Sequence, residues 1–140
     1  MLPRFKVSEA GVTTRRQRDD GPWEIGHGLK AMWTPGASMG QTVLHLQRPA
    51  GGGGVLFSGR NAGYDDITES VSSFAVEDDH SSSEHAESLA TLADAADDWD
   101  FEWLLPARGA PLRFASPQLA REALGAASRH AAAAARAGAT

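Results

Sequence analysis

Short runs of alternating apolar residues, separated by Gly and Pro, constrain the fold of this chain more than any other feature. Residues 22–33 read as two short strands broken at Gly26-His27-Gly28, because apolar residues occupy alternate positions on both sides of the break. Residues 41–47 alternate in the same way, and residues 55–57 form a short apolar run typical of a buried strand. Thr34-Pro35-Gly36 ends the second run, since Pro donates no backbone hydrogen bond and Gly tolerates turn dihedrals. The pattern of residues 22–57 therefore predicts a β-sheet in this half of the chain.

Two helices and a further strand are predicted in the second half of the chain. Ser81 with Glu84 three residues later is a capping-box pattern, and the apolar spacing that follows predicts a helix up to about residue 96. Residues 99–105 predict a strand that Pro106 stops. Ser116 is a good N-cap with Pro117 at the first helical position, so a final helix begins there.

The remaining segments predict little regular structure. Residues 59–79 have a weak pattern and are expected to form a loop. Residues 131–135 are helix-prone alanines with almost nothing to bury, so this end of the last helix is expected to fray. The length of 140 residues allows one domain, which we assign to residues 1–128, followed by an Ala-rich tail over residues 129–140.

Composition excludes several classes of protein. No apolar run approaches the length of a membrane span, and the N-terminus lacks the apolar core of a secretory signal. The absence of Cys excludes disulfide scaffolds, thiolate zinc sites and cysteine nucleophiles.

Charge is distributed unevenly along the chain. Residues 65–102 hold 13 of the 18 acidic residues and no Lys or Arg, although the net charge is only −5. An acidic block beside basic flanks argues against nucleic-acid binding, which needs a dominant basic face. The block is interpreted as a solvated surface, with a docking patch for a basic partner as the alternative.

Three ordered motifs resemble those of metallo-β-lactamase-fold hydrolases. Residues 34–40, TPGASMG, stand where that family carries T-P-G-H-T-x-G. Residues 55–60, VLFSGR, resemble its V-L-F-x-G-D strand end, and residues 101–109, FEWLLPARG, resemble F-E-W-I-L-P-G-H-G. The preceding GPWEIG, residues 21–26, resembles the strand that enters this half in plant and cyanobacterial members. The resemblance implies an α/β fold equivalent to the C-terminal half of an αββα sandwich, with a mixed sheet and two flanking helices.

The same resemblance implies that the metal ligands of the family are replaced in this chain. Ala37 and Arg108 stand at His positions of the family, and Arg60 stands at the position of its bridging Asp. Ala has no donor atom and Arg is a permanent cation, so neither can hold zinc or iron. The family's H-x-H-x-D-H motif does not occur in the sequence. We therefore expect no metal cofactor and no catalytic residues.

A half sandwich would leave one sheet face uncovered, which implies a partner protein or a second copy. The first functional hypothesis is a non-catalytic structural or interaction subunit. The second is a metal-dependent hydrolase that uses zinc or iron and is completed by another chain or by residues outside this sequence. The third is an anion-binding module in which Arg60 and Arg108 bind a carboxylate or phosphate. For the third, the competing interpretation is internal pairing of each Arg with Asp65, Asp66 or Asp100.

His80 and His85 remain as a low-ranking metal-site candidate beside the acidic residues 77–79 and Glu84. A solvated helix start explains the same composition, since acidic groups favour helix N-termini. Resemblance to plant-type members implies a chloroplast, with the cytoplasm as the alternative. The Ala-, Gly- and Arg-rich composition is that expected from a GC-rich genome such as that of a green alga.

Overall fold

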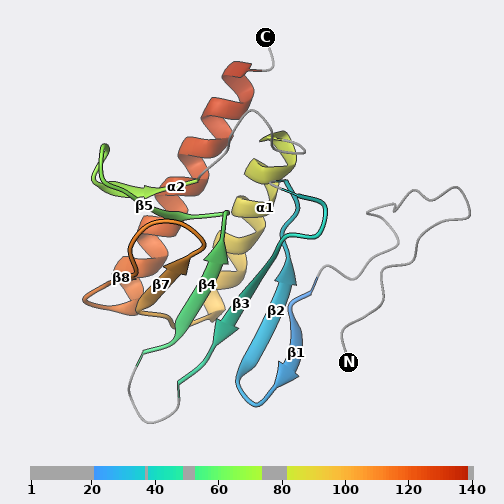
Figure 1. The fold of residues 1–140 in the computed structure, drawn as a ribbon, viewed down its shortest axis with the longest axis vertical. Helices are drawn as coiled ribbons and strands as arrows, with labels where there is room; N and C mark the ends of the chain where they lie inside the picture. The colour runs from blue at the N-terminus through green and yellow to red at the C-terminus, as the bar shows by residue number, and fades with distance from the viewer. Residues whose placement is uncertain (1–20, 37, 49–52, 74–81, 139–140) are drawn as a thin grey trace, which may run out of the picture.

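The alternating runs form the strands of one large sheet, which two helices accompany (Figure 1). The computed structural model describes residues 21–36, 38–48, 53–73 and 82–138. Its strands are β1 (Trp23–Gly26), β2 (Leu29–Trp33), β3 (Thr42–Leu46), β4 (Val55–Gly59), β5 (Gly63–Asp65), β6 (Ser70–Ser72), β7 (Trp103–Pro106) and β8 (Leu112–Arg113). Its helices are α1 (Ser82–Ala95), the short 3-10 helix η2 (Ala96–Asp98) and α2 (Pro117–Gly138).

The large sheet has the strand order β1-β2-β3-β4-β7-β8. Neighbouring strands are antiparallel except β4 and β7, which are parallel because α1 and the small β5–β6 sheet lie between them in sequence. The predicted fold class, α/β with a mixed sheet and two flanking helices, is confirmed.

Both helices pack on the same face of the large sheet (Figure 1). Alternate strand residues point toward them, and these residues join the helices' apolar stripes in one core. The largest buried members of this core are Met32, Val43, Leu56, Leu89, Leu92, Trp99, Phe101, Leu104 and Leu124. The helices also contact each other, so they cover this face as one layer.

The end of α2 differs from the prediction. The helix is continuous across residue 128 and ends at Gly138, beyond the stretch that was expected to fray. Ala131 is partly buried against the core, which explains why this part of the helix remains ordered. At the other end, the Ser116 hydroxyl accepts a hydrogen bond from the Leu119 amide at 3.2 Å, so the predicted cap is confirmed.

The segment expected to be a loop contains the β5–β6 hairpin, and this prediction was wrong. Each strand of the hairpin is three residues long and mostly polar, so neither carries a readable alternation. Val71 packs against the core, whereas Ile67 at the hairpin turn is 90% exposed. The strand predicted over residues 99–105 is shorter, β7 beginning at Trp103, because Trp99 and Phe101 enter the core from irregular backbone.

Candidate functional site

The three motifs end at one edge of the large sheet. Strands β2, β4 and β7 run in the same direction, since β2 and β4 are both antiparallel to β3 and β7 is parallel to β4. Their C-terminal ends therefore lie at the same edge of the sheet, with β3 between β2 and β4. The Ala107 amide donates to the Gly59 carbonyl at 2.9 Å, which joins the ends of β4 and β7. We call the residues here the strand-end cluster: Thr34, Pro35, Gly36, Gln41, Ser58, Gly59, Arg60, Asn61 and Arg108.

The turn after β2 packs directly against α1. The Ser88 hydroxyl, which is buried on α1, donates to the Pro35 carbonyl at 2.6 Å. A β-carbon on Gly36 would lie 2.3 Å from the His85 α-carbon and 2.4 Å from its backbone nitrogen. Gly36 also has φ +144°, in the region that favours glycine. Gly36 is needed here because α1 and the turn approach too closely for a side chain at this position.

Buried hydrogen bonds join this turn to the end of β4. The Asn61 side-chain amide donates to the Thr34 hydroxyl at 2.7 Å, and the Thr34 backbone amide donates to the Gln41 carbonyl at 2.8 Å. The Ser58 hydroxyl donates to the Ala62 carbonyl at 2.6 Å and so closes its own turn. These groups are nearly inaccessible to solvent. These groups form hydrogen bonds inside the protein, so the cluster holds the turn after β2 against the end of β4.

The three positions at which the resemblance implies replaced metal ligands lie in different surroundings. Arg60 is half-buried and Arg108 is exposed, both at the strand-end cluster, whereas Ala37 lies outside the described residues. Asp100, one of the proposed partners for these Arg residues, is bonded to Arg121 at 3.0 Å instead. No group of three or more His, Cys, Asp or Glu that could hold a metal ion occurs within residues 21–36, 38–48, 53–73 and 82–138.

The His residues fall at separate places. His85 is buried on α1 beside Gly36, and its former candidate partner His80 lies outside the described residues. His27 is exposed in the turn between β1 and β2.

His45 is packed inside the protein. It stacks on Trp99 with ring centroids 4.9 Å apart, and its Nε2 lies 3.0 Å from the Asp100 carbonyl. Burial lowers the pKa of the His45 imidazole, and Lys30 adds to this, whereas the bond to the Asp100 carbonyl and the Asp100 charge oppose it. The neutral ring is therefore the form that the fold favours.

The face of the sheet opposite the helices is mainly apolar across five strands. By strand alternation and cross-strand pairing it carries the polar Thr42 and the apolar residues Trp23, Ile25, Leu29, Ala31, Trp33, Leu44, Leu46, Val55, Phe57, Trp103 and Leu105. We call this set the open face, because neither α1 nor α2 covers it (Figure 1). Phe57 at its centre is 38% exposed, a large value for a Phe on a central strand, whereas Ala31, Trp33 and Val55 on the same face are buried.

Charge is nearly absent from the open face. Arg113 on β8 is opposite Trp103 and is the one charged strand residue there among those that the structure describes. Its guanidinium lies 5.6 Å from the centre of the Trp103 ring and 3.8 Å from the Glu102 carboxylate. The resemblance to half of a sandwich predicted that one sheet face would lack a covering layer. Neither α1 nor α2 lies on the open face, and its lining residues follow from the strand registers.

The sequence and the fold of this chain differ in how far they resemble known proteins. No protein-family profile and no curated protein sequence matches the chain. Among solved structures, the chain is similar to ST1585 from Sulfolobus tokodaii, an archaeal metallo-β-lactamase superfamily protein, with 18% identity over 70% of this chain and a TM-score of 0.45. It is also similar to VMB-1, solved at pH 5.5, with 14% identity over 76% of this chain and a TM-score of 0.48.

The chain covers 32% of the ST1585 chain and 45% of the VMB-1 chain, so it spans less than half the length of either. None of the described helices is long and apolar enough to cross a membrane. One of these two structural neighbours, ST1585, is described as a metallo-β-lactamase superfamily protein.

Proposed function

We propose that this chain is a non-catalytic, metallo-β-lactamase-like interaction subunit that associates through its open face with a second copy of itself. The observation that carries this proposal is the apolar sheet face over β1 to β4 and β7 on which neither helix lies, with Phe57 exposed at its centre. Five strands of four to five residues, about 4.8 Å apart and rising about 3.3 Å per residue, give a face of roughly 20 by 15 Å. A patch of roughly 300 Å² is about as large as the largest apolar patch on an ordinary monomer, and such patches are often functional.

A second copy suits this face because the face has almost no charge of its own. Two open faces placed against each other bury apolar side chains on both sides, as in a β-sandwich. Arg113 is already held by Trp103 and Glu102, so it brings no unpaired charge to the contact. The acidic residues of α1 lie on the other side of the sheet, where two copies would keep them apart.

The strand-end cluster supports the non-catalytic part of the proposal. Thr34, Ser58 and Asn61 are buried and bonded to one another or to backbone. Arg60 and Arg108 stand where the family resemblance implies metal ligands. A metal-dependent hydrolase remains the alternative, in which another chain supplies zinc or iron ligands.

The test is a charge placed on the open face. Phe57→Lys would put an ammonium group at its centre, and burying that charge without a partner is unfavourable. Ile67→Lys and Leu119→Lys are matched controls, because both replace exposed apolar residues elsewhere. We expect sedimentation equilibrium to give a dimer for the wild type and both controls, and a monomer for Phe57→Lys. A monomeric wild type would contradict the proposal.

A second candidate function is anion binding by Arg60 and Arg108. The parallel pairing of Gly59 with Pro106 is what brings these two residues to the same sheet edge. Inorganic phosphate would then raise the melting temperature of the wild type, and Arg108→Ala would remove that gain. An equal gain in both proteins would contradict a role for Arg108.

A further inference from the structure

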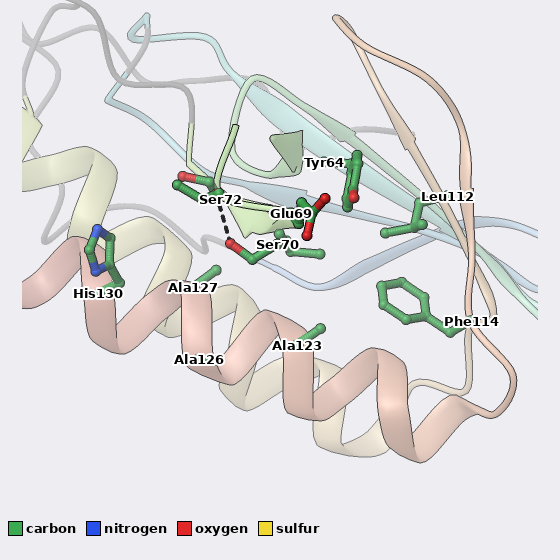
Figure 2. Close-up of a pocket in the computed structure, with 12 residues that line it drawn as sticks. Tyr64, Glu69, Ser70, Ser72, Leu112, Phe114, Ala123, Ala126, Ala127 and His130 are labelled. Carbon is green, nitrogen blue, oxygen red and sulfur yellow. Dashed lines mark hydrogen bonds between the residues drawn. The ribbon is translucent and has the colours of Figure 1, made fainter. Parts of the chain in front are cut away.

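A cavity of about 560 Å³ lies between the β5–β6 hairpin and α2 (Figure 2). It shares no residue with the strand-end cluster or the open face. The cavity exists because α2 faces the hairpin mainly with the methyl groups of Ala123, Ala126 and Ala127, which fill little of the space between the two elements, and His130 is the one larger α2 side chain in the lining. Its remaining apolar wall comes from Val71, Leu112 and Phe114.

Polar groups gather on the hairpin side of this cavity. Figure 2 shows Tyr64 and Glu69 above the apolar wall, with Ser70 beside them. The Ser70 hydroxyl is 2.9 Å from the Thr68 hydroxyl, so these two groups satisfy each other. The Glu69 carboxylate makes no hydrogen bond or ion pair with any other residue that the structure describes. The Glu69 carboxylate is therefore available to bind a ligand in the cavity, and it is the one acidic group in the lining.

Glu69 also has an unusual backbone conformation. Its φ is +52°, and among the described residues it is the one non-glycine with a positive φ. A Gly or Asn would adopt this conformation more easily, so Glu carries a conformational cost at this position. Such outliers cluster at functional sites, and here the outlier presents a carboxylate at the cavity mouth.

The residues that line the cavity include one acidic group, Glu69, and no Lys or Arg. His130 on α2 is the one lining group that can become a cation. An apolar cavity with a carboxylate at its entrance suits a molecule with an apolar body and a cationic head.

We propose that this cavity binds a small organic amine, with its apolar body against Phe114 and the α2 alanines and its ammonium group beside Glu69 and Tyr64. The volume is within the range of ligand pockets, roughly 300–1,000 Å³. The site is independent of the proposed self-association, because it lies on α2 and the hairpin rather than on the open face.

The experiment uses three probes that share one apolar body: 4-phenylbutylammonium, 4-phenylbutanol and 4-phenylbutanoate. Binding to the full chain is measured by two-dimensional NMR titration, following the amides of residues 64–72 and 123–130. We expect a dissociation constant of about 1 mM or tighter for the ammonium, as ligands of this size allow. The alcohol should bind at least fivefold more weakly, and the carboxylate more weakly still.

Variants at residue 69 separate charge from backbone conformation. Glu69→Asn removes the charge but suits a positive φ, and we expect the ammonium and the alcohol then to bind equally. Glu69→Asp keeps the charge and should retain a preference for the ammonium.

Variants on α2 test the location. Ala126→Phe at the exposed rim should block all three probes, whereas Ala134→Phe, on the same helix but outside the cavity, should not. Equal binding of ammonium and alcohol to the wild type would overturn the proposal. Tighter binding of the carboxylate than of the ammonium would also overturn it. So would amide chemical-shift changes that Ala126→Phe leaves unaltered.

Discussion

Gly36→Ala gives the most direct test of why the turn after β2 is retained. The added β-carbon would lie 2.3 Å from the His85 α-carbon and 2.4 Å from its backbone nitrogen. Real β-carbons do not approach backbone atoms this closely. Relief requires α1 or the turn to move, because no side-chain rotation can remove a clash with backbone. Movement of α1 would in turn disturb the Ser88 bond to the Pro35 carbonyl.

The expected cost has two parts. Overpacking a well-packed contact costs about 1–3 kcal/mol. The positive φ of Gly36 adds about 1–2 kcal/mol for a residue with a β-carbon. Together they predict a loss of roughly 3 kcal/mol in the free energy of unfolding, a large share of the ~5–15 kcal/mol typical of a domain.

Urea denaturation followed by far-UV circular dichroism measures this change. Gly40→Ala is the matched control, because a β-carbon there meets nothing within 4 Å and its change should be within about 0.5 kcal/mol. A Gly36→Ala protein as stable as the Gly40→Ala protein would refute the close-packing explanation. The motif would then need another reason for its glycine.

Three further predictions concern other parts of the fold. Burial lowers the pKa of His45 in the folded state, so its neutral form favours folding. The stability that it contributes is fully present above the unfolded pKa of about 6.5 and is lost as the pH falls below that value. Urea denaturation at several pH values should show that His45→Gln flattens this pH dependence. Ser116→Ala should cost about 1 kcal/mol by loss of the N-cap bond to Leu119, and an unchanged urea midpoint would contradict the cap. Elemental mass spectrometry of protein purified without chelator should find less than about a tenth of an equivalent of zinc, iron or manganese, whereas one equivalent would favour the hydrolase.

The sequence was most informative where one face of a strand is buried. Alternation identified β1, β2 and β3, because every second residue packs against the helices or lies on the open face. The Ser116-Pro117 pair correctly predicted the start of α2, because an N-cap depends only on residues that are close in sequence. That one sheet face would carry neither helix was also expected, since the motifs resemble only half of a two-layered fold.

The hairpin and the cavity could not be predicted in this way. Strands β5 and β6 are three residues long, and their pairing depends on contacts with α2 that lie far away in sequence. The same contacts keep Ala131 ordered where isolated helix propensity suggested fraying. The pairing of Asp100 with Arg121, rather than with Arg60 or Arg108, likewise depends on tertiary placement.

Sedimentation equilibrium of the wild type beside Phe57→Lys tests the central claim most directly. The account predicts a wild-type dimer that Phe57→Lys converts to a folded monomer, while Ile67→Lys leaves it unchanged. A wild type that stays monomeric at every concentration, or a Phe57→Lys dimer, would contradict association through the open face.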